Sequence, residues 1–349
     1  MSADFRPTAS WQHLRRRAEL LRRLRALFDD RGFLEVETPI LSADTVVDRH
    51  LDPFRTTVDR SMAPQAVHAA REHHSVSHGP GDHATSYDGE PRTLWLQTSP
   101  EFAMKRMLAA GARAIYQVAR VFRLGEQGPL HNPEFTMVEW YRAGDDMDRG
   151  MQLTSDLAEA MLDRGPARRV AYAEAFIEHV GLDPHTCEPE ALAAKARQLG
   201  VDAPASLCPR DRDGWLDLLL VDRVQPHLGR EQPVLLYDYP AGQAALARVR
   251  DDDPPVAERF ELYVDGIELA NGYHELLDAA ELRARNERVN AERIADGNPA
   301  LPDESRLLAA MEAGLPASTG VALGFDRLVM VATGAASLSK VMAFPIDRA

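Results

Sequence analysis

Two acidic side chains lie on either side of a tight turn in the segment FELYVDGIELANG, residues 260–272. Asp265-Gly266 is a strong signal for a two-residue hairpin between two strand-like runs. In that register Glu261 and Glu268 are diagonal neighbours on one face, about 7–8 Å apart at Cα. Carboxylates this close repel each other when buried, unless a cation or a proton joins them. Either a Mg²⁺ ion that also binds phosphates or an exposed sheet face with hydrated acids explains the pair.

The hairpin makes a detailed prediction about strand pairing. The predicted pairs are Val264 with Ile267, Tyr263 with Glu268, Leu262 with Leu269, and Glu261 with Ala270. The apolar face of the hairpin then consists of Leu262, Val264, Ile267 and Leu269.

A second group of chemically useful side chains lies in FRLGEQGPLHNPEFTMVEWY, residues 122–141. Arg123, His131 and Asn132 precede an aromatic ring, and strand alternation puts four side chains on one face: Phe135, Met137, Glu139 and Tyr141. A guanidinium binds phosphate oxygens and a ring stacks on a base, which suits a nucleoside triphosphate. The alternative is a core Phe with polar neighbours on the surface.

Other signatures of nucleotide or metal chemistry are missing from the sequence. It contains no Walker A loop and no GxGxxG fingerprint. The string HELLD at 274–278 differs from a zincin helix because Asp278 stands where the second His is required. Five histidines lie in residues 60–93, but without paired Cys or ligand spacing we expect a loop insertion there rather than a metal site.

Regular elements must position these groups. Apolar residues at helical spacing predict a helix between Ser10, which can cap it, and Gly32, where it ends. Its outer face is rich in Arg, and we favour a hydrated helix surface over a docking site for an acidic partner. Residues 33–41 read as an extended segment that turns at Pro39, and 115–123 and 135–141 read as strands.

The remaining segments are expected to complete the same domain. Residues 145–255 are predominantly helical in pattern, which predicts a helical insertion within the domain. A polar helix over 279–296 and a strand over 320–332 follow. The predicted fold class is therefore α+β.

The overall composition is that of a globular protein. The chain has 349 residues, 45% hydrophobic and 27% charged, and only two cysteines. No apolar run approaches the ~18 residues of a membrane span, and the N-terminus lacks the apolar stretch of a signal peptide, so we expect a cytoplasmic protein. A formal charge of −14 disfavours a surface that grips nucleic acid.

At this point the motifs resemble a known family. Residues 33–41 (FLEVETPIL), 122–141 and 320–327 (GVALGFDR) are similar to motifs 1, 2 and 3 of class II aminoacyl-tRNA synthetases. With TSPE at 98–101 and ELANGYHEL at 268–276, the resemblance is closest to lysyl enzymes and, within them, to the ligases that attach lysine to elongation factor P. It implies a single catalytic domain over 1–349 with a mainly antiparallel sheet flanked by helices. It also implies a homodimer with the first helix and Pro39 at the interface.

The resemblance also assigns roles in ATP and Mg²⁺ binding. It implies that Arg123 binds the α-phosphate, that His131 and Asn132 lie along the phosphates and adenosine, and that Phe135 stacks under adenine. Arg327 should clamp the triphosphate from the other side, with Arg123 and Arg327 as the catalytic pair. Glu261 and Glu268 match the positions that hold Mg²⁺. The full set expected to bind ATP is Arg123, Glu126, His131, Asn132, Phe135, Glu268, Leu269, Gly324 and Arg327.

The same resemblance places a lysine pocket. Its ε-ammonium is expected beside Glu101, Tyr141 and Glu275, with Ser99 nearby and Ala322 near the other end of the substrate. Two departures from the usual pattern follow. Gly125 replaces the usual carboxylate two residues after Arg123, so Glu126 is the expected substitute. Glu268 and Glu275 are seven residues apart and would face opposite sides of a regular strand, so a bulge is expected at Gly272 to bring both to one site.

The function implied is the activation of lysine, or its β isomer, as an adenylate, followed by transfer to a lysine ε-amine on elongation factor P. Residues 1–32 offer no room for an anticodon-binding domain, which with the negative charge favours a protein acceptor over tRNA. The alternatives are a synthetase paralogue that charges another acceptor and a non-catalytic regulatory paralogue. No membrane partner is expected.

Overall fold

The computed structural model describes residues 5–58 and 92–349. Its largest element is a mixed sheet, mainly antiparallel, in which only the two terminal pairs, β1 with β5 and β7 with β8, are parallel. The strands in spatial order are β1 (Leu34–Glu35), β5 (Ala114–Phe122), β6 (Glu134–Ala143), β12 (Ser318–Gly324), β11 (Ile267–His274), β10 (Val256–Val264), β8 (Val234–Pro240) and β7 (Arg168–Ala171), with β9 (Val249–Arg250) beside β10. The expected α+β class is confirmed.

A small second sheet precedes the first long strands of the main sheet. It consists of β2 (Leu41–Ser42), β4 (Arg92–Leu96) and β3 (Arg55–Val58), in that order. The insertion expected at 60–93 lies outside the described residues, apart from Arg92 and Thr93, which belong to β4.

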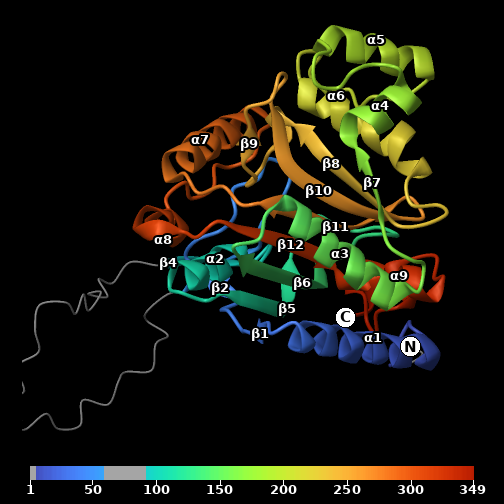
Figure 1. Ribbon diagram of the computed structural model, residues 1–349, viewed down its shortest axis with the longest axis vertical. Helices are drawn as coiled ribbons and strands as arrows, with labels where there is room; N and C mark the ends of the chain where they lie inside the picture. Colours follow the sequence, from blue (N-terminus) through green and yellow to red (C-terminus); the bar gives the residue numbers. More distant parts are fainter. Residues whose placement is uncertain (1–4, 59–91) are drawn as a thin grey trace, which may run out of the picture.

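Three helices cover one face of the main sheet, and the largest apolar core lies between them and the strands. They are α1 (Trp11–Asp30), α3 (Met147–Leu162) and α9 (Phe325–Thr333) (Figure 1). The predicted start of α1 is confirmed, since the Ser10 hydroxyl accepts a hydrogen bond from the His13 main-chain N–H at 3.1 Å. Leu24 and Phe28 of α1 are completely buried against this core.

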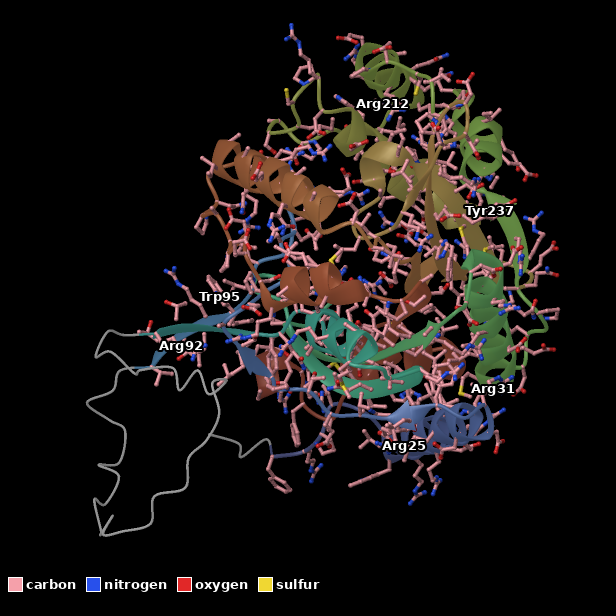
Figure 2. All side chains as sticks on the ribbon, turned by 60° about the vertical axis from the view of Figure 1, so that its left-hand side comes forward. Arg25, Arg31, Arg92, Trp95, Arg212 and Tyr237 are labelled. Carbon is pink, nitrogen blue, oxygen red and sulfur yellow. The ribbon has the colours of Figure 1, made fainter. Side chains whose placement is uncertain are left out.

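The Arg-rich face of α1 is largely paired within the chain. Its ion pairs are Arg16 with Glu19, Arg17 with Asp326, Arg23 with Asp163, Arg25 with Glu35 and Arg31 with Asp156. Arg25 and Arg31 lie with α1 along one edge of the molecule (Figure 2). Arg15 and Arg22 form no ion pair within the described residues, so the hydrated helix surface stays a prediction.

The opposite face of the sheet carries a separate core beneath α2 (Glu101–Ala109), α7 (Ala279–Ala295) and α8 (Arg306–Gly314). Strand alternation divides β6 between the two faces, because Val138 and Trp140 enter the first core while Tyr141 packs in the second. The predicted strands at 115–123 and 135–141 and the predicted helix at 279–296 are confirmed to within one or two residues.

The segment 145–255 contains more than helices. It includes α3, α4 (Tyr172–Val180), α5 (Pro189–Leu199) and α6 (Arg212–Leu219), but also β7, β8 and β9, which join the main sheet. Helices α4, α5 and α6 form a lobe beyond β7 and β8 (Figure 1). Short helical turns complete the chain: η2 (Leu220–Val224), η3 (Gln225–His227), η4 (Ala241–Gln243), η5 (Leu338–Lys340) and η6 (Ile346–Arg348).

The strand predicted over 320–332 is wrong in its second half. Strand β12 ends at Gly324, and α9 begins at Phe325. The run Leu328 to Val331 is buried throughout, so it shows no helical alternation of polar and apolar residues and reads as a strand in the sequence.

The Asp265-Gly266 hairpin forms as predicted at its turn and differs beyond it. Val264 pairs with Ile267 and Tyr263 with Glu268, but Leu262 then pairs with Ala270, so Leu269 is the extra residue of a bulge. The bulge expected at Gly272 is therefore wrong. Gly272 pairs regularly with Phe260, and a Cβ there would lie 2.3 Å from the Phe260 ring, which explains the glycine by close packing.

No helix within residues 5–58 and 92–349 is both long and apolar enough to cross a lipid bilayer.

Candidate functional site

A cavity of about 560 Å³ lies on the face of the sheet formed by β6, β12 and β11. Every residue expected to bind ATP or the amino acid lines it, from Ser99 at the start of α2 to Arg327 in α9. The exception among the expected site residues is Glu261, which does not line the cavity. The bulge at Leu269 shifts the side-chain alternation of β11 by one residue. As a result Glu268, Asn271 and Tyr273, together with Glu275 just after the strand, all line the same cavity.

Arg327 and His131 form one end of the cavity. Arg327 Nη2 lies 2.8 Å from His131 Nε2, and Arg327 Nη1 lies 3.0 Å from the Glu268 carbonyl and 3.4 Å from Glu268 Oε2. Burial, together with the Arg327 charge, lowers the pKa of His131, so the imidazole is neutral and accepts this hydrogen bond. The guanidinium is thus fixed by the β11 backbone at a position where it can meet an anion.

Arg123, which directly follows β5, provides a second cation in the cavity. Its guanidinium lies over the Phe135 ring, 5.1 Å from the centroid, and 3.7 Å from Glu126. Glu126 therefore lines the cavity next to Arg123, and its role as the substitute for the adenine-binding carboxylate stays a prediction. Two arginines and an aromatic ring in one cavity provide what a nucleoside triphosphate requires.

Asn132 is held in a structural role. Its side-chain amide donates to the Glu134 carbonyl at 2.6 Å, and its Oδ1 accepts from the main-chain N–H of Ile346 at 3.0 Å. The residue lines the cavity, but both ends of its amide bind the protein backbone. Asn132 thus ties the C-terminal segment to the phosphate end of the site.

The two glutamates of the hairpin differ in their surroundings. Glu261 Oε1 accepts from Arg259 at 2.6 Å, and its Oε2 accepts from the Tyr263 hydroxyl. Burial and the nearby Glu261 raise the pKa of the Glu268 carboxyl, which lines the cavity. Glu268 therefore fits a Mg²⁺ ion that also binds phosphate oxygens, whereas both carboxylate oxygens of Glu261 already accept hydrogen bonds from protein groups. Among the residues that the structure describes, no group of three or more His, Cys, Asp or Glu side chains could hold a metal ion by itself.

The opposite end of the cavity is an acidic pocket. Glu139 accepts hydrogen bonds from the Ser99 hydroxyl at 2.7 Å and from the Tyr141 hydroxyl. Glu275 is 1% exposed, and its Oε1 has no hydrogen-bond partner among the described residues. Gly320 lets Glu275 and Tyr141 pack directly against the backbone of β12, because a Cβ there would lie 2.2 Å from both Glu275 Oε1 and the Tyr141 ring.

Two buried carboxyls of this pocket, those of Glu139 and Glu275, have pKa values raised toward neutral pH. Burial and the charge of Glu101 raise the pKa of Glu139 to about 7. Burial raises the pKa of Glu275 to about 8, although Lys105 opposes the rise. An ammonium ligand would favour the ionised carboxylates, so its binding strengthens as the pH rises through this range.

Sequence reasoning missed two residues of the pocket. Lys105 of α2 is 2% exposed and forms ion pairs with Glu101 and Glu275. Strand alternation predicts that Glu139 shares a face with Phe135 and Tyr141, and this shared face is the signal for its place in the pocket. The Glu101-Lys105 spacing is common on exposed helices, so local spacing does not indicate that Lys105 is buried.

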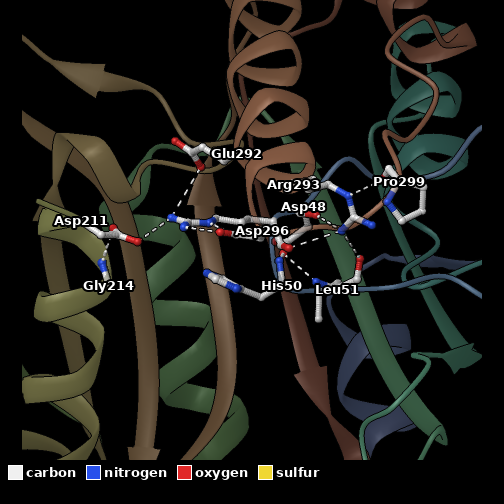
Figure 3. A network of polar contacts seen from close by, with 10 residues as sticks. Asp48, His50, Leu51, Asp211, Gly214, Glu292, Arg293, Asp296 and Pro299 are labelled. Atoms are coloured by element: carbon white, nitrogen blue, oxygen red, sulfur yellow. Dashed lines mark hydrogen bonds and ion pairs between the residues drawn. The ribbon is translucent and has the colours of Figure 1, made fainter. Parts of the chain in front are cut away.

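One wall of the cavity is a loop, residues 46–51, held by two arginines. Fully buried Arg293 of α7 donates to the carbonyls of Asp48 and Leu51. Arg49 forms ion pairs at 2.8 Å with both Asp211 and Asp296, which join this loop to the start of α6 and the end of α7 (Figure 3). The wall is thus fixed by contacts to two separate parts of the chain.

Comparison with known proteins agrees with this geometry. The family described as tRNA synthetases class II (D, K and N) matches residues 2–348. A protein of Edwardsiella ictaluri named "Elongation factor P--(R)-beta-lysine ligase" is 46% identical over 347 residues, which is 99% of each chain. Proteins with the same name from Proteus mirabilis and Salmonella typhi are each 45% identical over at least 99% of both chains. The chain therefore belongs to the class II tRNA synthetase family (D, K and N).

Proposed function

We propose that this protein is an ATP-dependent ligase that activates lysine, as (R)-β-lysine, and transfers it to a lysine ε-amine on elongation factor P. The observation that carries the proposal is a single cavity with two arginines at one end and a buried acidic pocket at the other. Triphosphate and a cationic amino acid can then lie end to end. The names of the relatives support the choice of amino acid and acceptor.

In the first step the substrate carboxylate attacks the α-phosphorus of ATP, and pyrophosphate leaves with its bonding electron pair. Arg123 and Arg327 would bind the phosphate oxygens whose charge increases as the phosphorus becomes pentavalent. Glu268 would hold Mg²⁺, which when bound neutralises further phosphate charge. The pocket of Glu101, Glu139, Tyr141 and Glu275 would hold the ammonium and so orient the carboxylate.

In the second step the acceptor amine attacks the carbonyl carbon of the adenylate. An amide bond forms, AMP leaves with the electron pair of the mixed anhydride bond, and the amine loses a proton. No covalent enzyme intermediate is required, because positioning and charge neutralisation lower both barriers. A translation factor as acceptor would place this activity in the cytoplasm.

The two alternatives have less support. A tRNA acceptor suits a chain with a net charge of −14 poorly. A non-catalytic paralogue has no need for Arg123, Glu268 and Arg327 around one cavity. These arguments favour catalysis with a protein acceptor.

Ala322 is the proposed determinant of the lysine isomer. It lies in β12 opposite Glu139 and Asn271 and lines the cavity. Its methyl group fills space where lysyl-tRNA synthetases usually have glycine. Ala322→Gly should lower the ratio of kcat/KM for (R)-β-lysine over α-lysine several-fold, within the ~1–3 kcal/mol that one methyl group is worth. Steady-state kinetics with both isomers measure this, and an unchanged ratio would place selectivity elsewhere.

We further propose that two copies associate through the edge formed by α1 and β1. Strand β1 is an edge strand, and several large apolar side chains are exposed along this part of the chain: Trp11, Leu34, Ile40 and Leu41. Sedimentation equilibrium should give twice the 38.7 kDa of one chain, and Leu34→Glu should shift the protein toward the single chain. A wild-type protein that sediments as one chain at all concentrations would exclude the dimer.

A further inference from the structure

Lys105 is a buried cation in contact with two carboxylates of the acidic pocket, although it does not itself line the cavity. It comes from the second turn of α2 and is 2% exposed. Its Nζ forms a close ion pair with Glu101 Oε1 and lies 2.5 Å from Glu275 Oε2, and it lies 6.0 Å from the centroid of the Tyr141 ring. The protein thus places an ammonium of its own between two of the carboxylates proposed to bind the substrate.

The charges of the pocket do not balance. Three carboxyl groups, those of Glu101, Glu139 and Glu275, face one lysine, so the fully ionised pocket keeps two negative charges. Glu275 Oε1 is buried and has no hydrogen-bond partner among the residues that the structure describes. A buried and unsatisfied carboxylate oxygen is costly, which identifies where a further cation would be bound.

We propose that Lys105 is a positioning residue for the amino-acid substrate. Its ammonium occupies one cation position of the pocket, holds Glu101 and Glu275 in place, and leaves the free side of Glu275 for the ammonium of the substrate. This inference rests on the proposed function. It explains how three buried carboxyl groups can bind a ligand that carries one net positive charge, because Lys105 neutralises part of their negative charge.

The choice of lysine at this position fits its size. Only three of the 40 basic residues of the chain are lysine, namely Lys105, Lys195 and Lys340. At Lys105 a compact ammonium meets Glu101 and Glu275 within one buried space, where a planar guanidinium would need more room. Lys105→Arg should therefore keep the charge but bind lysine more weakly.

Lys105 should also control the pH dependence of substrate binding. The titratable groups facing Glu275 are Lys105 and Glu101 of α2 and Glu139 and Tyr141 of β6, while Arg248 binds the Glu275 main-chain carbonyl. Lys105 is the cation that opposes the rise in the pKa of the Glu275 carboxyl. Without it the carboxyls stay protonated to higher pH, so an ammonium ligand binds less well near neutrality.

The test is lysine-dependent pyrophosphate exchange by Lys105→Met between pH 6 and 9.5. At pH 7 we expect kcat/KM for lysine to fall about tenfold or more, with the KM for ATP unchanged. A fall of this size results when the loss of Lys105 raises the pKa of the Glu275 carboxyl by about one unit or more. The deficit should shrink as the pH rises from 8 to 9.5, because the carboxyls of the variant then ionise. Lys340→Met, at an exposed position, is the matched control and should behave as wild type.

A second variant separates charge from packing. Lys105→Met combined with Glu101→Gln removes one charge of each sign and keeps the net charge of the pocket, so the midpoint of its pH profile should return toward that of wild type even though the loss of Glu101 itself weakens lysine binding. Parallel profiles for wild type and Lys105→Met, or no return in the double variant, would overturn the inference. Absence of exchange in the wild-type protein would instead contradict the proposed function, so the two failures are distinguishable.

Discussion

Replacing Arg327 by Ala should lower the rate of lysine-dependent pyrophosphate exchange by about 10²–10³-fold, the loss typical for one group that stabilises transition-state charge. The guanidinium is held at the phosphate end of the cavity by the Glu268 and Leu130 carbonyls and by His131. Its removal leaves Arg123 as the only member of the arginine pair that binds the developing charge. The KM for lysine should change little, since the acidic pocket is at the other end.

The matched control is Arg120→Ala, because Arg120 is a half-exposed arginine of β5 with a distant partner, Glu134 at 3.8 Å. It should retain wild-type exchange. Thermal unfolding of Arg327→Ala should confirm that the fold persists, with a cost of about 1 kcal/mol for each hydrogen bond lost. Normal exchange by a folded Arg327→Ala protein would rule out the assigned role.

Glu275→Gln should weaken lysine binding and leave ATP binding intact. The amide keeps the shape of the side chain but removes the charge beside the proposed ammonium site, so the KM for lysine should rise roughly 10- to 100-fold, equivalent to the ~1.5–3 kcal/mol of a hydrogen bond to a charged group. Wild-type kcat/KM for lysine should rise with pH through about 8 as Glu275 ionises. The variant should lose that part of the profile.

Glu304→Gln is the control for this variant, since Glu304 is an exposed carboxylate paired with Arg283. Lys105 keeps Glu101 as its partner in Glu275→Gln, so the buried lysine is not left alone. An unchanged lysine KM and an unchanged pH profile would mean that the ammonium binds elsewhere.

The sequence predicted the groups of the site better than the geometry between them. Strand alternation over 135–141 placed Phe135 and Tyr141 on one face, and both line the cavity. The Asp265-Gly266 turn set the first two pairs of the hairpin, because a two-residue turn fixes the register next to it. The bulge at Leu269 could not be located, since it depends on how β11 packs between β10 and β12.

The missed elements share one physical cause, which is contact between distant parts of the chain. Strand β7 has four residues and is stabilised by parallel pairing with β8, more than sixty residues later. Lys105 is buried because β11 brings Glu275 to α2. Local patterns of polar and apolar residues do not predict contacts with such distant segments.

The most direct test of the proposed activity is acceptor labelling with the wild-type protein. It would be incubated with ATP, Mg²⁺ and radiolabelled (R)-β-lysine, and with either elongation factor P or tRNA. The account predicts label on elongation factor P, with a mass increase of one β-lysyl group on a single lysine, and none on tRNA. Label on tRNA, or no label on elongation factor P while pyrophosphate exchange is active, would contradict it.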